Sequence, residues 1–194
     1  MTPFNGKDLD VFHAFRKALV LQKISGHQID QRHGVVAVLC PDCDQFADIY
    51  AHHSRLQKRQ RRKSRIHPIT RNGGTLRLIA SSKTNKRGRT TAKDLLDEIK
   101  ESLLLKNIKT VIVYVHAPCA KANGSGITFY ERLRDLFEAK KILKTLRRSV
   151  PGLKVACFCH IDFGPNFRRF GKRKRRLTYF ASREAWKKYL RSKC

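Results

Sequence analysis

The sequence predicts an α/β fold in which a parallel central β-sheet is flanked by helices. Three apolar runs, at 34–40, 110–115 and 153–161, are typical of buried parallel strands, and the segments between them carry helix signals. Parallel strands need crossover connections, which helices supply in right-handed β–helix–β units. With 194 residues and 41% hydrophobic content, the chain is expected to form one domain, 1–194, with a sizeable core.

The N-terminal segment, 1–30, is expected to form a helical arm. Apolar residues recur at helical spacing over 8–24, and Gly26 follows as a terminator. The continuous apolar run at 34–40 then predicts a buried strand that leads into a loop. A short strand at 66–70 is expected after the next helix, and paired glycines follow it.

The second half of the chain repeats the alternation of helix and strand. Thr90 or Thr91 is expected to cap a helix that runs to about Ser102. The β-branched run at 110–115 predicts the clearest strand, and it leads directly to His116. A helix over 128–148 and a strand over 153–161 should follow.

The C-terminal segment, 168–194, is expected to be a basic extension. It begins with a dense cationic tract, after which 177–180 predicts an edge strand. Ser182 is then placed to cap a short helix with Trp186 on its apolar face.

The charge balance indicates a polyanionic partner. The chain has 43 Lys and Arg against 15 Asp and Glu, a net charge of +28. Nucleic acid, either RNA or DNA, is the expected partner, because its phosphates release condensed counterions on binding. The alternative is a solvated surface. The predicted contact residues lie in two tracts and are Arg55, Lys58, Arg59, Arg61, Arg62, Lys63, Arg65, Arg168, Arg169, Lys172, Arg173, Lys174, Arg175 and Arg176.

Aromatic side chains interleave with the second tract, and two roles are open for them. Phe163, Phe167, Phe170 and Tyr179 are candidates for stacking on unpaired bases, or for packing in the core.

The location predicted from the sequence is cytoplasmic. Residues 1–6 show no basic region followed by an apolar stretch, and no run approaches the roughly 20 apolar residues of a membrane span. Six cysteines in such a chain indicate reduced thiols or metal ligands. Of these, Cys157 and Cys159 alternate in an apolar run and are expected to be buried hydrophobic residues.

A metal site is predicted where two strands end. Cys40 follows the first predicted strand, and His116 and Cys119 end the 110–115 strand. In open α/β sheets, the carboxyl ends of the strands form the ligand-binding edge. Thiolate and imidazole are ligands that Zn²⁺ prefers, and three protein ligands leave a fourth position for water.

Three motifs in order make the chain similar to the β-class carbonic anhydrases. They are a strand that ends in Cys-x-Asp at Cys40–Asp42, the Arg-Asn-Gly-Gly element at 71–74, and a strand that ends in His-x-x-Cys at His116–Cys119. Together they cover roughly residues 34–125, and the strand at 153–161 matches the family's fourth parallel strand. We therefore identify a β-carbonic-anhydrase-like fold as the expected architecture.

The resemblance implies a Zn²⁺ enzyme that hydrates carbon dioxide or a similar small electrophile by zinc-bound hydroxide. It implies Asp42 and Arg71 as catalytic residues, with Asp42 either orienting the hydroxide or serving as a fourth ligand. It also implies a homodimer that pairs through N-terminal helices and sheet edges. The family has arginine two residues after the aspartate, where this chain has Asp44.

A second function stays open on the residues alone. With Cys43, three residues after Cys40, the ligand set would be a complete tetrahedral shell, and a closed shell is typical of structural zinc. The alternative is therefore a non-catalytic nucleic-acid-binding module, an RNA or ribonucleoprotein component, with a structural zinc. His160 and Asp162 are expected to serve packing and a turn, and His52 and His53 to be exposed.

Overall fold

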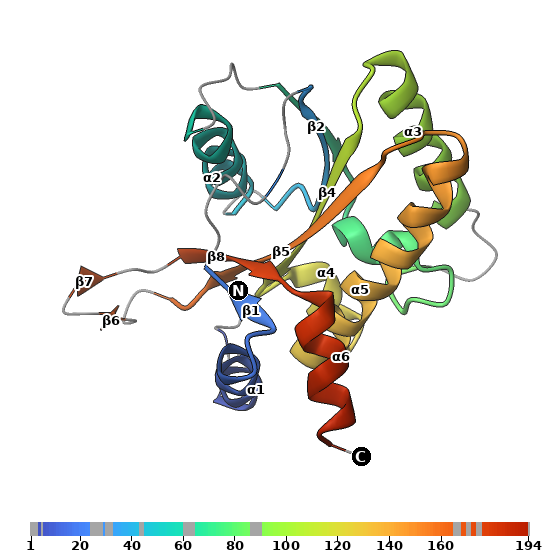
Figure 1. The fold of residues 1–194 in the computed structure, drawn as a ribbon. Coiled ribbons are helices and arrows are strands. Elements are labelled where there is room, and N and C mark those ends of the chain that lie inside the picture. Colours follow the sequence, from blue (N-terminus) through green and yellow to red (C-terminus); the bar gives the residue numbers. More distant parts are fainter. Residues whose placement is uncertain are drawn as a thin grey trace.

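A six-stranded sheet organises the computed structural model (Figure 1). Its strand order is β1-β8-β5-β4-β2-β3. Four neighbouring strands are parallel, as predicted: β3 (Ile66–Thr70), β2 (Val35–Leu39), β4 (Thr110–Ala117) and β5 (Lys154–Asp162). The structure describes the following residues, with only the backbone at 168, 169, 172 and 173: 4, 6–23, 29, 33–42, 45–59, 65–85, 91–164, 168–169, 172–173 and 176–193.

The sheet as a whole is mixed, so the prediction of an all-parallel sheet is wrong at one side. Strand β8 (Arg176–Ala181) runs antiparallel to β5, and β1 (Leu21–Gln22) runs antiparallel to β8. The chain passes from β5 to β8 through a small hairpin, β6 (Arg168–Arg169) and β7 (Lys172–Arg173), so it returns antiparallel without a helical crossover. The predicted edge strand at 177–180 is covered on its outer side only at its end, where β1 pairs with Phe180 and Ala181.

Helices cover both faces of the sheet (Figure 1). One face packs against α2 (Phe46–Arg59), which contributes Ile49 and Leu56 to a small apolar cluster with Tyr114 and Phe158. The other face carries a much larger core. It is built with helices α1 (Gly6–Lys17), α3 (Thr91–Leu105), α5 (Phe129–Thr145) and α6 (Arg183–Arg191).

The N-terminal helix is shorter than predicted. It ends at Lys17, and Leu19 adopts a left-handed backbone conformation with φ of 57°. Leu21 then begins β1, where the predicted helix would have continued to residue 24. The reason is tertiary: pairing with β8 satisfies the backbone of β1, while Phe12 and Phe15 of the helix are buried in the main core.

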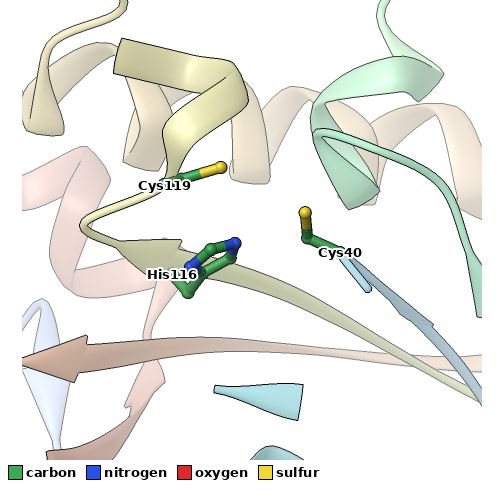
Figure 2. Close-up of side chains that lie close together, drawn as sticks. All are labelled: Cys40, His116 and Cys119. Carbon is green, nitrogen blue, oxygen red and sulfur yellow. The ribbon is translucent and has the colours of Figure 1, made fainter. Parts of the chain in front are cut away.

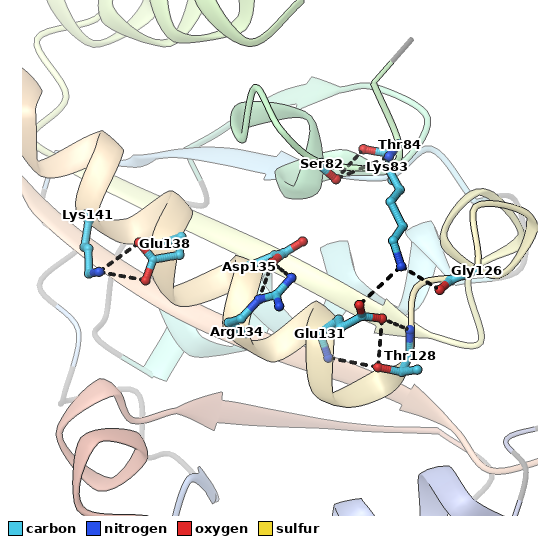
Figure 3. A network of polar contacts seen from close by, with 10 residues as sticks. All are labelled: Ser82, Lys83, Thr84, Gly126, Thr128, Glu131, Arg134, Asp135, Glu138 and Lys141. Carbon is cyan, nitrogen blue, oxygen red and sulfur yellow. Dashed lines mark hydrogen bonds and ion pairs between the residues drawn. The ribbon is translucent and has the colours of Figure 1, made fainter. Parts of the chain in front are cut away.

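Helix α5 begins with a capping box. Thr128 Oγ1 accepts from the Glu131 amide, and the Glu131 carboxylate accepts from the Thr128 amide at 2.8 Å. Figure 3 shows that Lys83 also donates to this carboxylate, at 3.3 Å, and to the Gly126 carbonyl. These contacts hold the loop after the 3₁₀ turn Gly74–Leu78 against the start of α5.

Strand β3 forms one edge of the sheet and contains Pro68. It pairs with β2: the Arg65 carbonyl accepts from Val35, and the Arg71 amide donates to Leu39. Because alternate residues of a strand direct their backbone groups to opposite sides, the proline ring occupies the outer side. None of the helices within the described ranges combines the length and apolar character that crossing a membrane requires.

Candidate metal centre

Two parallel neighbours in the sheet bring the predicted ligands to the same edge. Cys40 directly follows β2, and His116 is the penultimate residue of β4. Cys119 comes after Pro118 and stands at the N-cap of the short helix α4 (Ala120–Gly124). Figure 2 shows the two sulfur atoms and the imidazole ring pointing toward one another.

The three donor groups converge closely enough to share one metal ion. One ligand atom from each of Cys40, His116 and Cys119 lies within 4.8 Å of the others, and all three residues are buried. Donor atoms around a tetrahedral Zn²⁺ are about 3.5 Å apart, so a small contraction would complete the coordination. Among the residues that the structure describes, no other group of three potential ligands has its donor atoms this close together.

The tautomer of His116 is set by its neighbours. Its Nδ1 lies 2.9 Å from the carbonyl oxygen of Pro118, and a carbonyl only accepts, so Nδ1 carries the proton. The lone pair is therefore on Nε2, which is buried and has no hydrogen-bond partner in the described part of the chain. A buried acceptor without a partner is costly, and a metal ion would satisfy it.

Gln45 fixes the same carbonyl from the other side. Its Nε2 donates to the Pro118 oxygen at 2.9 Å, and its side chain is fully buried before the first turn of α2. The Pro118 oxygen thus accepts from both Gln45 and His116. Sequence reasoning missed this residue, because no motif distinguishes a glutamine that supports a ligand from one on a surface.

The Arg-Asn-Gly-Gly element supports Cys40 through its backbone. The Gly73 amide donates to Cys40 Sγ at 3.4 Å. At Gly74, where φ is +53°, an added Cβ would lie 2.7 Å from the Cys40 nitrogen and 2.9 Å from the Leu39 carbonyl carbon. Only glycine fits that approach, so the paired glycines let this turn close against the cysteine.

A hydrogen bond links the side chains of Cys40 and Cys119. The hydrogen bond with Cys119 raises the pKa of Cys40 above its usual range, and burial adds to the effect. The same hydrogen bond lowers the pKa of Cys119 well below its usual range. A metal ion would replace the proton of this hydrogen bond and bind both sulfur atoms as thiolates.

A buried arginine underlies the site. Arg132 on α5 is 2% exposed and donates to the carbonyl oxygens of His116, at 3.4 Å, and Ile127, at 3.1 Å, and to Asn123 Oδ1. Burial lowers the pKa of Arg132, and the nearby Cys119 opposes that shift. The guanidinium thus ties β4, the loop before α5 and α4 together beneath Cys119.

The two predicted catalytic residues are placed differently from the ligands. Asp42 is half-buried and starts α2, since its carbonyl accepts from the amides of Gln45 and Phe46, but its carboxylate is not among the three converging donors. Arg71 turns to the surface, where it pairs with Glu98. Its side chain therefore does not meet the cysteines, although its backbone belongs to the supporting turn. Cys43, the predicted fourth ligand, lies outside the described residues.

The polar pair at the end of β5 has its own partners. His160 lies in register with His116 and its Nδ1 is 2.7 Å from Thr178 Oγ1. Asp162 pairs with Arg176 at 2.9 Å and accepts from the Gly164 amide. These contacts agree with the predicted packing and turn roles. Cys157 and Cys159 are fully buried, as predicted, and burial raises the pKa of Cys157 to about 12.

The predicted exposure of His52 and His53 is wrong. His53 is 1% exposed beneath α2, and its Nδ1 lies 3.4 Å from the Tyr114 hydroxyl. Burial lowers the pKa of His53 to about 3, and burial together with Arg55 and Arg59 lowers that of His52 to about 4. The prediction relied on the polar composition of α2. Both imidazoles lie on the side of this helix that faces the sheet, where they contact the ring of Phe158.

The predicted nucleic-acid-binding residues divide into four groups. Arg55, Lys58, Arg59 and Arg65 are exposed, whereas Arg176 is half-buried in ion pairs. The structure gives the backbone of Arg168, Arg169, Lys172 and Arg173 as the hairpin β6–β7. Predictions for Arg61, Arg62, Lys63, Lys174 and Arg175 fall outside the described residues.

Comparison with known proteins identifies no relative of this chain. No family model, curated protein or solved structure matches the chain.

Proposed function

We propose that the chain is a zinc protein of carbonic-anhydrase type, in which Cys40, His116 and Cys119 hold Zn²⁺ and the centre hydrates carbon dioxide or a similar small electrophile. The observation that supports this is the convergence of three buried donors within 4.8 Å at the carboxyl edge of parallel strands. The orphaned Nε2 of His116 supports a metal in preference to a plain thiol pair.

The donor set suits zinc and its chemistry. Two thiolates and one imidazole are a common zinc ligand set, and with a fourth position open the ion lowers the pKa of a bound water to about 7. No fourth ligand from the described residues reaches the three donors. Cys43, the candidate fourth ligand, lies outside those residues, so the proposal of an open centre is tested below by cobalt substitution.

Residues that contact the three ligands would hold them in position. Pro118 and Gln45 hold the His116 ring with its lone pair inward. Gly73 orients the Cys40 sulfur. Such supporting contacts orient ligands and tune metal affinity.

Asp42 is the residue in this proposal that would accept a hydrogen bond from the group in the fourth position. It follows Cys40 by two residues, and its charge is close enough to contribute to the raised pKa of Cys40. In this role it would orient the nucleophile and would not bind the metal. Arg71, paired with Glu98 at the surface, has no direct part in the proposed step.

Metal analysis tests the ligand set first. Purified protein should contain about one zinc per chain, as expected for a single site. Cys40→Ser and His116→Ala should lose it, while Cys157→Ser, at a buried cysteine away from the site, should retain it. Retention of zinc by both ligand variants would contradict the proposed centre.

Cobalt substitution separates an open centre from a closed one. Thiolate-bound Co²⁺ gives visible absorption bands, and added thiocyanate should shift them if the fourth position is open. Zinc-loaded protein should also accelerate carbon dioxide hydration in stopped-flow measurements, and Cys40→Ala should not. Bands that do not respond to thiocyanate, together with hydration no faster than that of Cys40→Ala, would indicate a structural zinc with four protein ligands.

A further inference from the structure

A cluster of exposed cations surrounds the C-terminal end of α2. Arg55, Lys58 and Arg59 are spaced i, i+3 and i+4 and are exposed. Arg65 lies beside them, because Gln57 of α2 grips its backbone: the Gln57 Nε2 donates to the Arg65 carbonyl at 3.2 Å, and the Arg65 amide donates to Gln57 Oε1 at 3.0 Å. We name these four residues the α2 basic patch.

The patch has no neutralising partner among the described residues. The acidic residue of α2, Asp48, is in the first turn and pairs with Arg176 at 2.6 Å. Other described cations, such as Arg71 and Lys83, are paired with glutamates, whereas none of the four patch residues has an ion pair. The potential at the patch is positive enough for Arg55 and Arg59 to contribute to the low pKa of His52.

The hairpin β6–β7 places further cations opposite one another. Arg168 is in register with Arg173, and Arg169 with Lys172. The short ribbon therefore carries four basic residues in two register pairs. In Figure 1 this ribbon projects from the end of the sheet where β5 meets β8.

Arg176 connects α2 with the two strands on either side of the hairpin in the sequence, β5 and β8. Arg176 begins β8, three residues after the end of β7, and its guanidinium bonds Asp48 in the first turn of α2 and Asp162 at the end of β5. The patch lies at the other end of α2.

We propose that the α2 basic patch and the β6–β7 ribbon form a binding site for the phosphate backbone of duplex nucleic acid. A two-stranded ribbon and a basic helix end are elements that dock on duplexes, and lysine and arginine contacts to phosphate supply affinity without sequence readout. This site is separate from the proposed metal centre and does not depend on it.

Of the four aromatic residues predicted to stack or pack, Phe167 and Phe170 lie outside the described residues, and the other two favour packing in the core. Phe163 packs against Phe4 and Phe12 in edge-to-face contacts. Tyr179 is 3% exposed and packs against Phe12, with Arg16 over its ring. These described aromatics belong to the core, so they are not available as stacking platforms of the kind that single-strand binders use.

Salt-dependent binding of the full chain tests the proposal. The probes are fluorescent RNA and DNA duplexes of about 20 base pairs, roughly two helical turns, and a single strand of the same length. The affinity for one or both duplexes should fall linearly with salt on logarithmic axes. Neutralising Arg55, Lys58, Arg59 and Arg65 to glutamine should reduce the slope by about 3 to 4, since each phosphate contact contributes about 0.9.

A charge-matched control separates a site from general attraction. Lys187, Lys188, Arg191 and Lys193 are exposed on or just after α6, which lies far from α2 in Figure 1. Changing these four to glutamine removes the same charge and should leave the slope almost unchanged. Neutralising the four ribbon residues Arg168, Arg169, Lys172 and Arg173 should reduce it as the patch variant does.

Defined outcomes overturn the proposal. Equal loss of slope in the patch and α6 variants would mean diffuse attraction without a site. Tighter binding to the single strand than to either duplex would replace duplex recognition with unpaired strands. Binding to phosphatidylserine vesicles with equal affinity would indicate a general anionic surface. Circular dichroism of each variant confirms that a lost slope does not come from unfolding.

Discussion

The metal centre and the α2 basic patch lie on the same scaffold but are built on opposite principles. At the metal centre, Cys40, His116 and Cys119 are each at most 7% exposed, and neighbouring residues fix their positions. At the patch, four cations are exposed and their side chains have no ion-pair partners in the described chain. The centre is therefore defined by packing, and the patch by charge.

The two regions should therefore respond to different perturbations. Close packing transmits small changes in volume, so the metal centre should respond to substitutions that add or remove a few atoms. Exposed charges respond to salt and to neutralisation, and tolerate changes of shape. Four sets of substitutions in the two regions test this contrast.

The largest effect is expected at Gly74. Gly74→Ala places a Cβ 2.7 Å from the Cys40 nitrogen on a backbone with φ of +53°, so we expect a loss of about 3 kcal/mol in unfolding free energy and weaker zinc binding. Chemical denaturation and metal analysis measure the two effects. Gly124→Ala is the control, because nothing lies within 4 Å of its added Cβ. Equal stability of both variants would show that the turn is loosely packed.

The second prediction concerns the histidines beneath the patch. The pKa of His52 is lowered to about 4 and that of His53 to about 3, from the usual 6.5, chiefly by burial. The unfolded chain therefore takes up protons first as the pH falls, so stability is lost from about pH 6.5 downward. The steepest loss is about 1.4 kcal/mol per pH unit for each histidine.

Denaturation curves between pH 7 and pH 4, roughly the range over which unfolded histidines gain charge, measure that loss. Replacing His52 and His53 with glutamine should flatten the pH dependence. Replacing the exposed His13 should not. A double variant with the same pH dependence as the parent would show that both imidazoles are charged or exposed in the folded protein.

The third prediction contrasts two buried glutamines. Gln45 supports the His116 ring through Pro118, whereas Gln57 grips Arg65 beside the patch. Gln45→Met should weaken zinc binding about tenfold, in the range found when supporting contacts of a ligand are removed. Gln57→Met should leave zinc affinity unchanged. Competition with a chromophoric chelator measures both, and equal affinities would remove Gln45 from the support of the metal centre.

The smallest effect is a shift at His52. Burial is the largest cause of its low pKa, and Arg55 and Arg59 add to it. Neutralising both arginines should raise the pKa of His52 while leaving it below 6.5, whereas Lys58→Gln should have little effect. An NMR titration of the imidazole measures this. Bound duplex should act in the same direction, and an unmoved signal under saturating duplex would argue against phosphate contact at these arginines.

Much of the parallel core could be predicted from the sequence. The strands β2, β4 and β5 carry continuous β-branched or apolar runs, the short strand β3 was expected before the paired glycines, and Thr128 and Ser182 cap two of the expected helices. The meeting of Cys40 with His116 and Cys119 also followed, because adjacent parallel strands end at one edge. These features are encoded locally or by simple topology.

The remaining features depend on tertiary contacts that no local pattern encodes. Strand β1 has two residues, and its apolar spacing matched a continuing helix until β8 offered a pairing partner. Gln45 and Arg132 have polar side chains that sequence patterns assign to surfaces, yet both are buried by hydrogen-bonding to carbonyls around the metal centre. The burial of such polar residues can be predicted only when the positions of their hydrogen-bond partners are known.

The proline on the edge strand limits how copies of this protein can associate. Pro68 has no amide hydrogen, and it occupies the outward side of β3, where an incoming strand would need a donor. A continuous intermolecular sheet built on that edge would therefore lack a rung at its middle. Self-association at this edge should therefore rely on side-chain surfaces, and the edge is protected against growth into fibrous stacks.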